Sequence, residues 1–120
     1  MEQTNTTELQ QLIKEITGKA TPEQIELLKA AVIKKYGPTH KVYQYVVDGL
    51  TCYLRSVDRD LYAMAAAKIS VSPAKFSETV IEGIWLGGDK AIKDVDQYRF
   101  ALIDHVEELM NKKKGDLGEL

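Results

Sequence analysis

The side chains best able to contact a nucleic acid lie between positions 59 and 79 of this 120-residue chain. Lysine can hydrogen-bond to guanine, glutamate can accept a hydrogen bond from cytosine, and serine or threonine can bond to a base or a phosphate. A helix start at Ser72-Pro73 would add the partial positive charge of a helix N-terminus. We therefore expect Arg59 and Ser70 to contact phosphates of double-stranded DNA. The full set of expected DNA contacts is Arg59, Ser70, Ser72, Lys75, Ser77, Glu78 and Thr79.

Two short helices joined by a tight turn would have to position these side chains. Residues 61–88 predict an alanine-rich helix, a turn at 69–72 and a second helix. A helix-turn-helix needs a small residue where the helices approach, a small turn residue before a buried apolar one, and an apolar residue facing the first helix. We therefore expect this motif over residues 58–86. The residues with the required spacing are Ala66, Ser70, Val71 and Phe76.

The charge of the chain argues against DNA binding. The whole chain has a net charge of −2, whereas a domain that binds phosphates usually has a basic excess. The alternative prediction is a protein-interaction module that has the same helical fold without DNA binding. It would bind its partner through the acidic face of the second helix or through the last helix. That acidic face has a net charge of −1 and consists of Lys75, Glu78, Thr79 and Glu82.

Helix boundaries can be predicted along most of the chain. Residues 21–24, Thr-Pro-Glu-Gln, have the form of a capping box with proline at the first helical position, and Gly37-Pro38 should end the helix that follows. Asp58 can cap a further helix. Gly87-Gly88 should connect the second helix of the motif to a last long helix that begins at Asp89.

The chain as a whole predicts an all-α fold. Three prolines and eight glycines leave room for long helices, and a chain of this length can bury a core without metal or disulfide support. We expect a single helical domain over residues 1–120, with about six helices and a frayed tail at 115–120. Phe100 and Ile103 lie off the apolar stripe of the last helix, so their exposure would indicate a homodimer through that helix.

Residues 39–57 are compatible with two structures. Asp48-Gly49 between two runs rich in valine, tyrosine and leucine is typical of a β-hairpin. The apolar residues of the same stretch also recur with helical spacing. A hairpin would be apolar on both faces, with Val42 and Val46 on one of them, and a lone two-stranded ribbon has nothing to cover the second. We therefore expect a helix over about 40–56.

Two stretches together resemble a known family. Residues 37–46, GPTHKVYQYV, resemble the opening of the C-terminal DNA-binding domain of the sporulation master response regulator of spore-forming bacteria, and residues 61–68, LYAMAAAK, resemble a helix of that domain. Residues 72–84 then lie where the family has its recognition helix. The resemblance implies an all-helical domain that binds promoter DNA in the major groove. This chain lacks the family's receiver domain and the arginines of its recognition helix, so it would act as a stand-alone transcriptional regulator.

The sequence predicts neither an enzyme nor a protein that binds a cofactor or a metal. No nucleophile has a base at a recognisable spacing, no glycine-rich phosphate loop follows a strand, and His40 and His105 have no third ligand at metal-site spacing. Cys52, the one cysteine, is expected to be a buried apolar residue. Arg55 could contact the DNA backbone or pair with Asp58.

The ends of the chain also allow predictions. Met1 to Thr7 is polar, unlike a signal peptide, and no apolar run approaches the roughly 20 residues that cross a bilayer. We therefore expect a cytoplasmic protein with no membrane partner. Lys112-Lys113-Lys114 could touch phosphates, but cations are also expected at a helix C-terminus.

Overall fold

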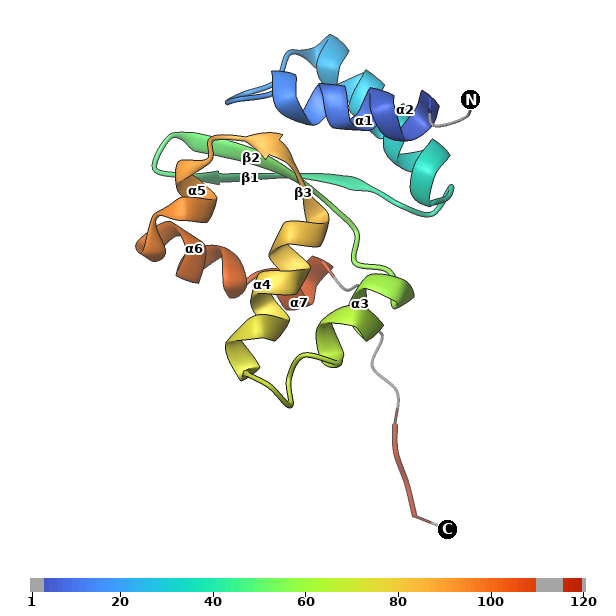
Figure 1. The fold of residues 1–120 in the computed structure, drawn as a ribbon, viewed down its shortest axis with the longest axis vertical. Helices are drawn as coiled ribbons and strands as arrows, with labels where there is room; N and C mark the ends of the chain where they lie inside the picture. The colour runs from blue at the N-terminus through green and yellow to red at the C-terminus, as the bar shows by residue number, and fades with distance from the viewer. Residues whose placement is uncertain (1–3, 110–115, 120) are drawn as a thin grey trace.

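Residues 4–109 and 116–119 are described by the structure, a computed structural model in which helices surround a small sheet (Figure 1). The predicted all-α fold is wrong, because three strands form an antiparallel sheet in the order β1-β2-β3. The elements, in chain order, are α1 (Thr4–Glu15), α2 (Pro22–Tyr36), β1 (Val42–Val47), β2 (Leu50–Arg55), α3 (Arg59–Ala66), α4 (Pro73–Ile84), β3 (Trp85–Gly88), α5 (Ala91–Asp94), α6 (Asp96–Ile103) and α7 (Val106–Leu109).

The segment predicted as a helix at 40–56 is a β-hairpin. β1 and β2 pair in register along their length, and Val47 lies opposite Leu50 beside the turn. Between the strands, Asp48 and Gly49 have positive φ angles of 50° and 79°. Two successive positive φ angles are typical of the two-residue turns whose twist matches antiparallel strands. The turn signal therefore outweighs the helical spacing of the apolar residues.

Both faces of the hairpin carry apolar residues, and both are covered except towards the turn, where Val46 is 54% exposed. Tyr43, Tyr45 and Val47 pack against one buried cluster, whereas Val42 packs against another. Figure 1 shows α1 and α2 on one side of the sheet and α4 to α7 on the other. The helix prediction failed because it assumed a lone ribbon. β3, from a distant part of the sequence, pairs with β2 and completes a sheet that two helical layers can cover.

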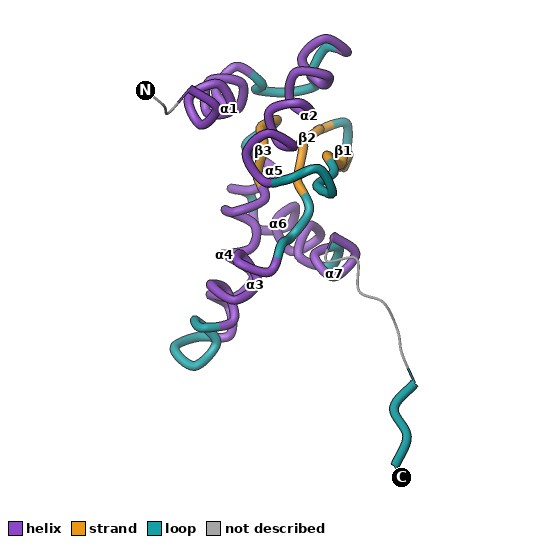
Figure 2. The backbone as a smooth tube through the Cα atoms, turned by 90° about the vertical axis from the view of Figure 1, so that its right-hand side faces the viewer, coloured by secondary structure: helices purple, strands orange, loops and turns teal. Residues whose placement is uncertain are grey.

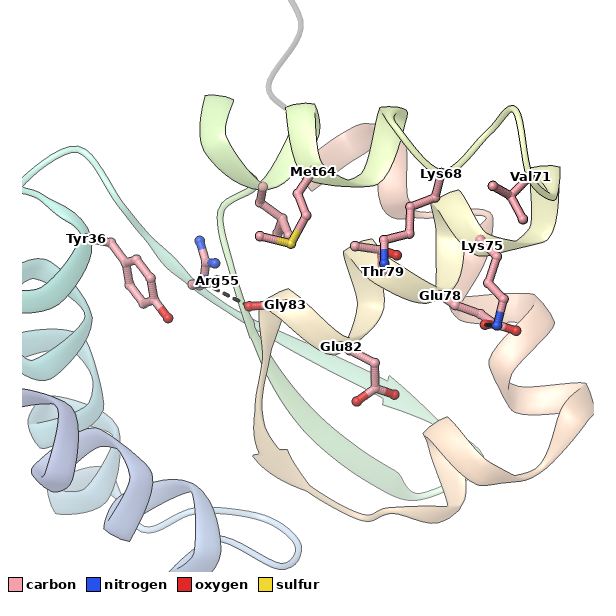
Figure 3. A pocket seen from close by; sticks show the side chains of 11 residues that line it. Tyr36, Arg55, Met64, Lys68, Val71, Lys75, Glu78, Thr79, Glu82 and Gly83 are labelled. Carbon is pink, nitrogen blue, oxygen red and sulfur yellow. Dashed lines mark hydrogen bonds and ion pairs between the residues drawn. The ribbon is translucent and has the colours of Figure 1, made fainter.

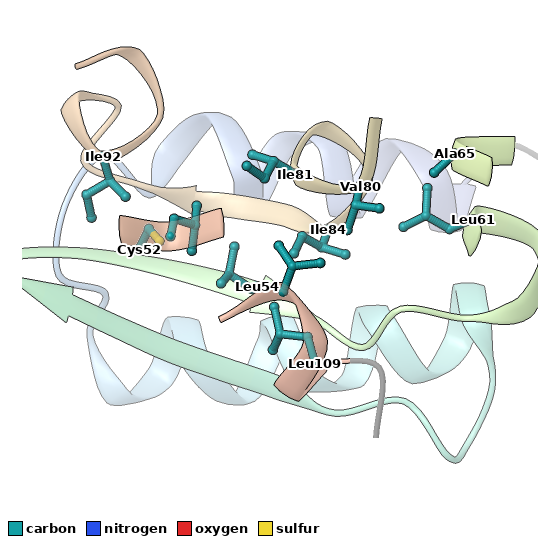
Figure 4. Packing of buried hydrophobic residues seen from close by; sticks show 11 residues of the cluster. Cys52, Leu54, Leu61, Ala65, Val80, Ile81, Ile84, Ile92 and Leu109 are labelled. Atoms are coloured by element: carbon teal, nitrogen blue, oxygen red, sulfur yellow. The ribbon is translucent and has the colours of Figure 1, made fainter. Parts of the chain in front are cut away.

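The two clusters meet at β2, whose side chains alternate between them. Cys52 and Leu54 belong to the larger cluster and Tyr53 to the smaller one. The Tyr53 hydroxyl accepts a hydrogen bond from Ala20 N (3.0 Å) and donates one to Gln44 Oε1 (3.2 Å), so its buried polar end is satisfied. The larger cluster (Figure 4) comprises Cys52, Leu54, Leu61, Ala65, Val80, Ile81, Ile84, Ile92, Leu102, Val106 and Leu109, and the smaller one comprises Leu9, Ile16, Ala20, Leu28, Ala31, Val32, Tyr53 and Leu86.

The segment after α4 is strand β3, not the connector between helices that the sequence predicted at Gly87-Gly88. Both glycines have φ angles that other residues rarely adopt, 119° and 125°. Gly88 also lies so close to β2 that a Cβ atom there would collide with Cys52 and with the Thr51 carbonyl oxygen. Asp89 holds the end of the strand, since its Oδ2 accepts from Thr51 N (2.9 Å) and its N–H donates to Thr51 O (2.8 Å).

The last long helix predicted from Asp89 is divided into α5, α6 and α7. Val95 interrupts it with an extended backbone at ψ 124°, and Arg99 Nη1 donates to the Lys93 carbonyl oxygen (3.0 Å) across the break. The bends allow all three short helices to place side chains in the larger cluster. A straight helix would extend away from the sheet.

Predictions for the C-terminal part have mixed outcomes. Phe100 is 62% exposed, but Ile103 is half-buried against the larger cluster, so the two residues do not form one exposed surface. Residues 116–119 have no regular secondary structure and are exposed. Lys112-Lys113-Lys114 and the remaining tail positions lie outside the described residues.

The predicted helix start at 21–24 is confirmed. Gln24 N donates to Thr21 Oγ1 (3.1 Å) and Thr21 N donates to Gln24 Oε1 (3.0 Å), which is the reciprocal pair of a capping box. The predicted cap of α3 is also confirmed, because Leu61 N donates to Asp58 Oδ1 (2.8 Å).

Replacing Gly88 by alanine should destabilise the fold more than replacing Gly49. A positive φ costs alanine about 1–2 kcal/mol at either position, but a Cβ at Gly49 meets nothing within 4 Å, whereas one at Gly88 collides with β2. We expect Gly88→Ala to lower the free energy of unfolding in urea by about 1–3 kcal/mol more than Gly49→Ala. Equal effects of the two substitutions would contradict the position of β3.

Candidate functional site

Helices α3 and α4 form where the sequence predicted two helices, but they meet differently from the expected motif. The connection covers residues 67–72, longer than the turn of about three or four residues usual in a helix-turn-helix, and it projects at one end of the molecule (Figure 2). Val71, which the motif spacing requires to be buried, is 82% exposed. The close approach occurs at Gly83, where a Cβ atom would lie 2.5 Å from Leu61 Cδ1.

The fold divides the predicted DNA-contacting residues into two groups. Lys75, Glu78 and Thr79 lie together along a groove, and the other four do not line it. Lys75 Nζ lies 3.4 Å from Glu78 Oε1, so the lysine expected to bind a base already has a partner. Outside the groove lining, Arg59 and Ser70 are exposed, and Ser72 and Ser77 are half-buried.

The α3–α4 groove, as we call it, lies between these two helices and has a volume of about 780 Å³. Met64, Lys68 and Val71 come from α3 and the following turn, and Tyr36 and Arg55 lie at the end of the groove nearest the sheet (Figure 3). The complete lining is Tyr36, Arg55, Leu61, Met64, Lys68, Val71, Lys75, Glu78, Thr79, Glu82 and Gly83.

Arg55 is buried at the sheet end of the groove and is held from several elements. Its side chain is 6% exposed, and its Cζ lies 3.8 Å from the centroid of the Tyr36 ring, in a cation–π contact. Nε donates to the Gly83 carbonyl oxygen (3.0 Å). Nη1 donates to Ser56 O (3.1 Å) and to Asp58 Oδ2 (3.4 Å). Arg55 thus connects β2 with α2, with α4 and with the cap of α3.

Asp58 supports both the start of α3 and this arginine. Its Oδ1 accepts the hydrogen bond from Leu61 N, and its Oδ2 also lies 3.3 Å from His40 Nε2. Partial burial acts to raise the pKa of Asp58, but the Leu61 hydrogen bond, the Arg55 charge and the His40 hydrogen bond together lower it. The fold therefore stabilises the ionised carboxylate.

Several groove residues were not identified from the sequence as site residues. The sequence predicts no site role for Tyr36, Met64, Lys68 or Gly83. For Arg55 it allows two roles, of which pairing with Asp58 is confirmed. One signal was available for Arg55, since a cation in an otherwise apolar strand is usually paired when buried. Tyr36 and Gly83 carried no such signal, because they meet Arg55 from distant parts of the chain.

The α3–α4 groove offers hydrogen bonding, charge and apolar contact. Cys52 lies outside it in the larger cluster, where burial and the nearby Asp89 raise the pKa of the thiol to about 12.

Among the residues that the structure describes, no three histidine, cysteine, aspartate or glutamate side chains are placed to hold a metal ion. None of the described helices has the length and apolar character needed to cross a membrane.

The fold and the groove define an α/β domain whose three-stranded sheet is covered by helices on both faces. Comparison with protein-family models, with curated proteins and with solved structures finds no match to this chain. The resemblance to the sporulation regulator therefore stays a prediction from the sequence.

The Asp58→Asn substitution should destabilise the fold at neutral pH and have little effect in acid. Because the folded-state pKa of Asp58 lies below its unfolded value near 4, its contribution is present above about pH 4 and is lost as pH falls through the folded-state pKa. We expect a loss of about 1–2 kcal/mol at about pH 7, measured by urea denaturation. A difference that does not change with pH would contradict the ionised pair with Arg55.

Cys52 should be chemically inert in the folded chain. The thiolate is the reactive form of cysteine, and the raised pKa leaves almost none of it at about pH 8. We expect no prompt reaction with Ellman's reagent in native buffer and complete reaction after unfolding in urea. Prompt reaction of the folded chain would show that Cys52 is accessible from the surface.

Proposed function

We propose that this chain is a cytoplasmic protein-binding module whose α3–α4 groove takes a segment of a partner protein. The observation that carries the proposal is an exposed apolar surface on α3 and the turn that follows it. Met64 and Val71 line the groove itself. The exposed fractions in this stretch are 44% for Tyr62, 58% for Met64, 48% for Ile69 and 82% for Val71.

This apolar surface is of the kind that marks an interaction site. Single exposed apolar side chains are normal on a protein, but two of them in one groove, Met64 and Val71, favour association with another molecule. Burial against a partner would contribute about 25 cal/mol for each Å² of apolar area removed from water. A groove between two helices suits an amphipathic helix or an extended peptide segment.

The charges of α4 give less support to DNA binding, which the sequence also predicted. Lys75 is paired with Glu78, and Glu82 Oε1 lies 3.4 Å from Lys93 Nζ. DNA binding depends on cations that neutralise phosphates and release counterions. We therefore place a protein segment in the groove and treat duplex DNA as the competing ligand.

A photoreactive benzoylphenylalanine in place of Val71 should cross-link to a partner protein in cells that express the chain. Met64→Glu should reduce this product about tenfold or more, because it places an unpaired charge in the apolar contact. Met64→Leu, which conserves the apolar contact, should retain it. Leu27, 54% exposed on α2, is the matched control position at which the photoreactive residue should give no such product.

A test of binding to duplex DNA distinguishes this proposal from the DNA-binding alternative. The proposal predicts unchanged mobility of promoter-length duplexes at low salt, with or without Lys75→Ala. It is contradicted by salt-dependent retardation that Lys75→Ala weakens, together with cross-linking that does not respond to Met64→Glu.

A further inference from the structure

The geometry of Arg55 points to a carboxylate as the polar group that the α3–α4 groove binds, carried on an aspartate or glutamate beside an aliphatic side chain of the partner segment. This inference rests on the proposed function, because it names the chemistry of the segment that the groove would take. Arg55 Nη2 binds the carboxylate, Lys68 adds positive charge, and Met64 contacts the aliphatic neighbour.

Arg55 has donors that the fold does not use. A guanidinium carries five N–H groups, and the hydrogen bonds from Arg55 to the rest of the described chain use Nε and Nη1 only. Within the described part of the chain no hydrogen bond uses Nη2, although the side chain is 6% exposed. Nη2 is not sealed from solvent, so an acceptor from a ligand would replace water at this donor. A carboxylate is among the strongest acceptors for a guanidinium N–H.

The guanidinium is also fixed in place before any ligand arrives. The Tyr36 ring lies against it at 3.8 Å, and the Gly83 carbonyl oxygen accepts from Nε at 3.0 Å. A side chain that is already immobilised loses little conformational freedom on binding. Arg55 is therefore suited to bind one acceptor in one direction, unlike the exposed lysines.

The other charges of the groove leave a positive excess at Lys68. Lys75 pairs with Glu78 across the α4 side, and Glu82 pairs with Lys93. In the part of the chain that the structure describes, Lys68 has no ion-pair partner, and it lines the groove. A single anionic group is thus favoured, whereas the two glutamates on the α4 side disfavour a densely charged ligand such as a phosphate chain.

The apolar part of the groove specifies the residue beside the carboxylate. Figure 3 shows Met64 between Arg55 and Lys68 along the groove, with Val71 beyond them. Met64 and Val71 are 58% and 82% exposed, and methionine adapts its shape readily to aliphatic partners. A ligand whose carboxylate reaches Arg55 therefore also covers Met64, and this contact favours an apolar residue beside the carboxylate in the ligand.

Selection from a random library of displayed 12-residue peptides tests the inference without knowledge of the natural partner. The full chain is immobilised, and peptides that also bind the Met64→Glu variant are removed. We expect the remaining peptides to share an aspartate or glutamate beside leucine, isoleucine, methionine or phenylalanine. For a synthetic peptide of this kind, changing its acid to the amide should raise Kd about tenfold or more, which corresponds to about 1.4 kcal/mol.

Variants of the chain locate the carboxylate, and the amide form of the peptide controls for any loss of stability in a variant. Arg55→Lys keeps the charge and loses the guanidinium, so it should weaken the acidic peptide more than its amide form. Lys68→Ala should weaken the acidic peptide about two- to fivefold. Lys29→Ala, on the exposed surface of α2 beside Glu26, is the matched control and should leave Kd unchanged.

The outcomes distinguish this inference from the proposed function. Peptides that require Met64 but carry no acid, or tolerate the amide, would overturn the carboxylate inference and leave the proposed function standing. Absence of any Met64-dependent peptide would count against both. Sedimentation of the chain alone as a dimer that Met64→Glu dissociates would instead place a second copy in the groove, and would overturn the inference of a separate partner.

Discussion

The central sheet has apolar side chains on both of its faces, so water must be excluded from both. β2 carries this constraint most directly, because Cys52 and Leu54 belong to one cluster while Tyr53 belongs to the other. Two helical layers follow from it: α1 and α2 on one side, and α4 to α7 on the other. Gly88 then allows the third strand to lie against β2 at a distance that no side chain would permit.

The same arrangement creates the α3–α4 groove. β2 ends at Arg55, whose guanidinium lies between the Tyr36 ring of the first layer and the Gly83 carbonyl of the second. Asp58 then accepts from Arg55 and caps α3, so the start of one groove wall depends on the end of the central strand. The far end of the groove is the projecting turn, where Val71 is free of the core. One end of the groove is therefore held by the contacts of Arg55, and the other end is exposed.

The parts of the fold set by local interactions were predictable from the sequence. The capping box at 21–24 and the Asp58 cap depend on residues within one helical turn, and both were identified correctly. The hairpin was misjudged although Asp48-Gly49 signalled it, because its second face is covered only through β3 and through helices distant in sequence. At the site, the burial of Arg55 could not be predicted from local sequence either. Its burial depends on Tyr36 and Gly83, which no local pattern connects with it.

Amide hydrogen exchange tests whether residues 42–47 form the outer strand β1 of the sheet. Opposed residues of an antiparallel pair alternate between bonded and non-bonded positions, and the bond from Ser56 N to Lys41 O sets the phase. This outer strand should show slow exchange at Tyr43 and Tyr45, and fast exchange at Gln44 and Val46, whose N–H groups point away from β2. Uniform protection across 42–47, as a helix would show, would contradict it.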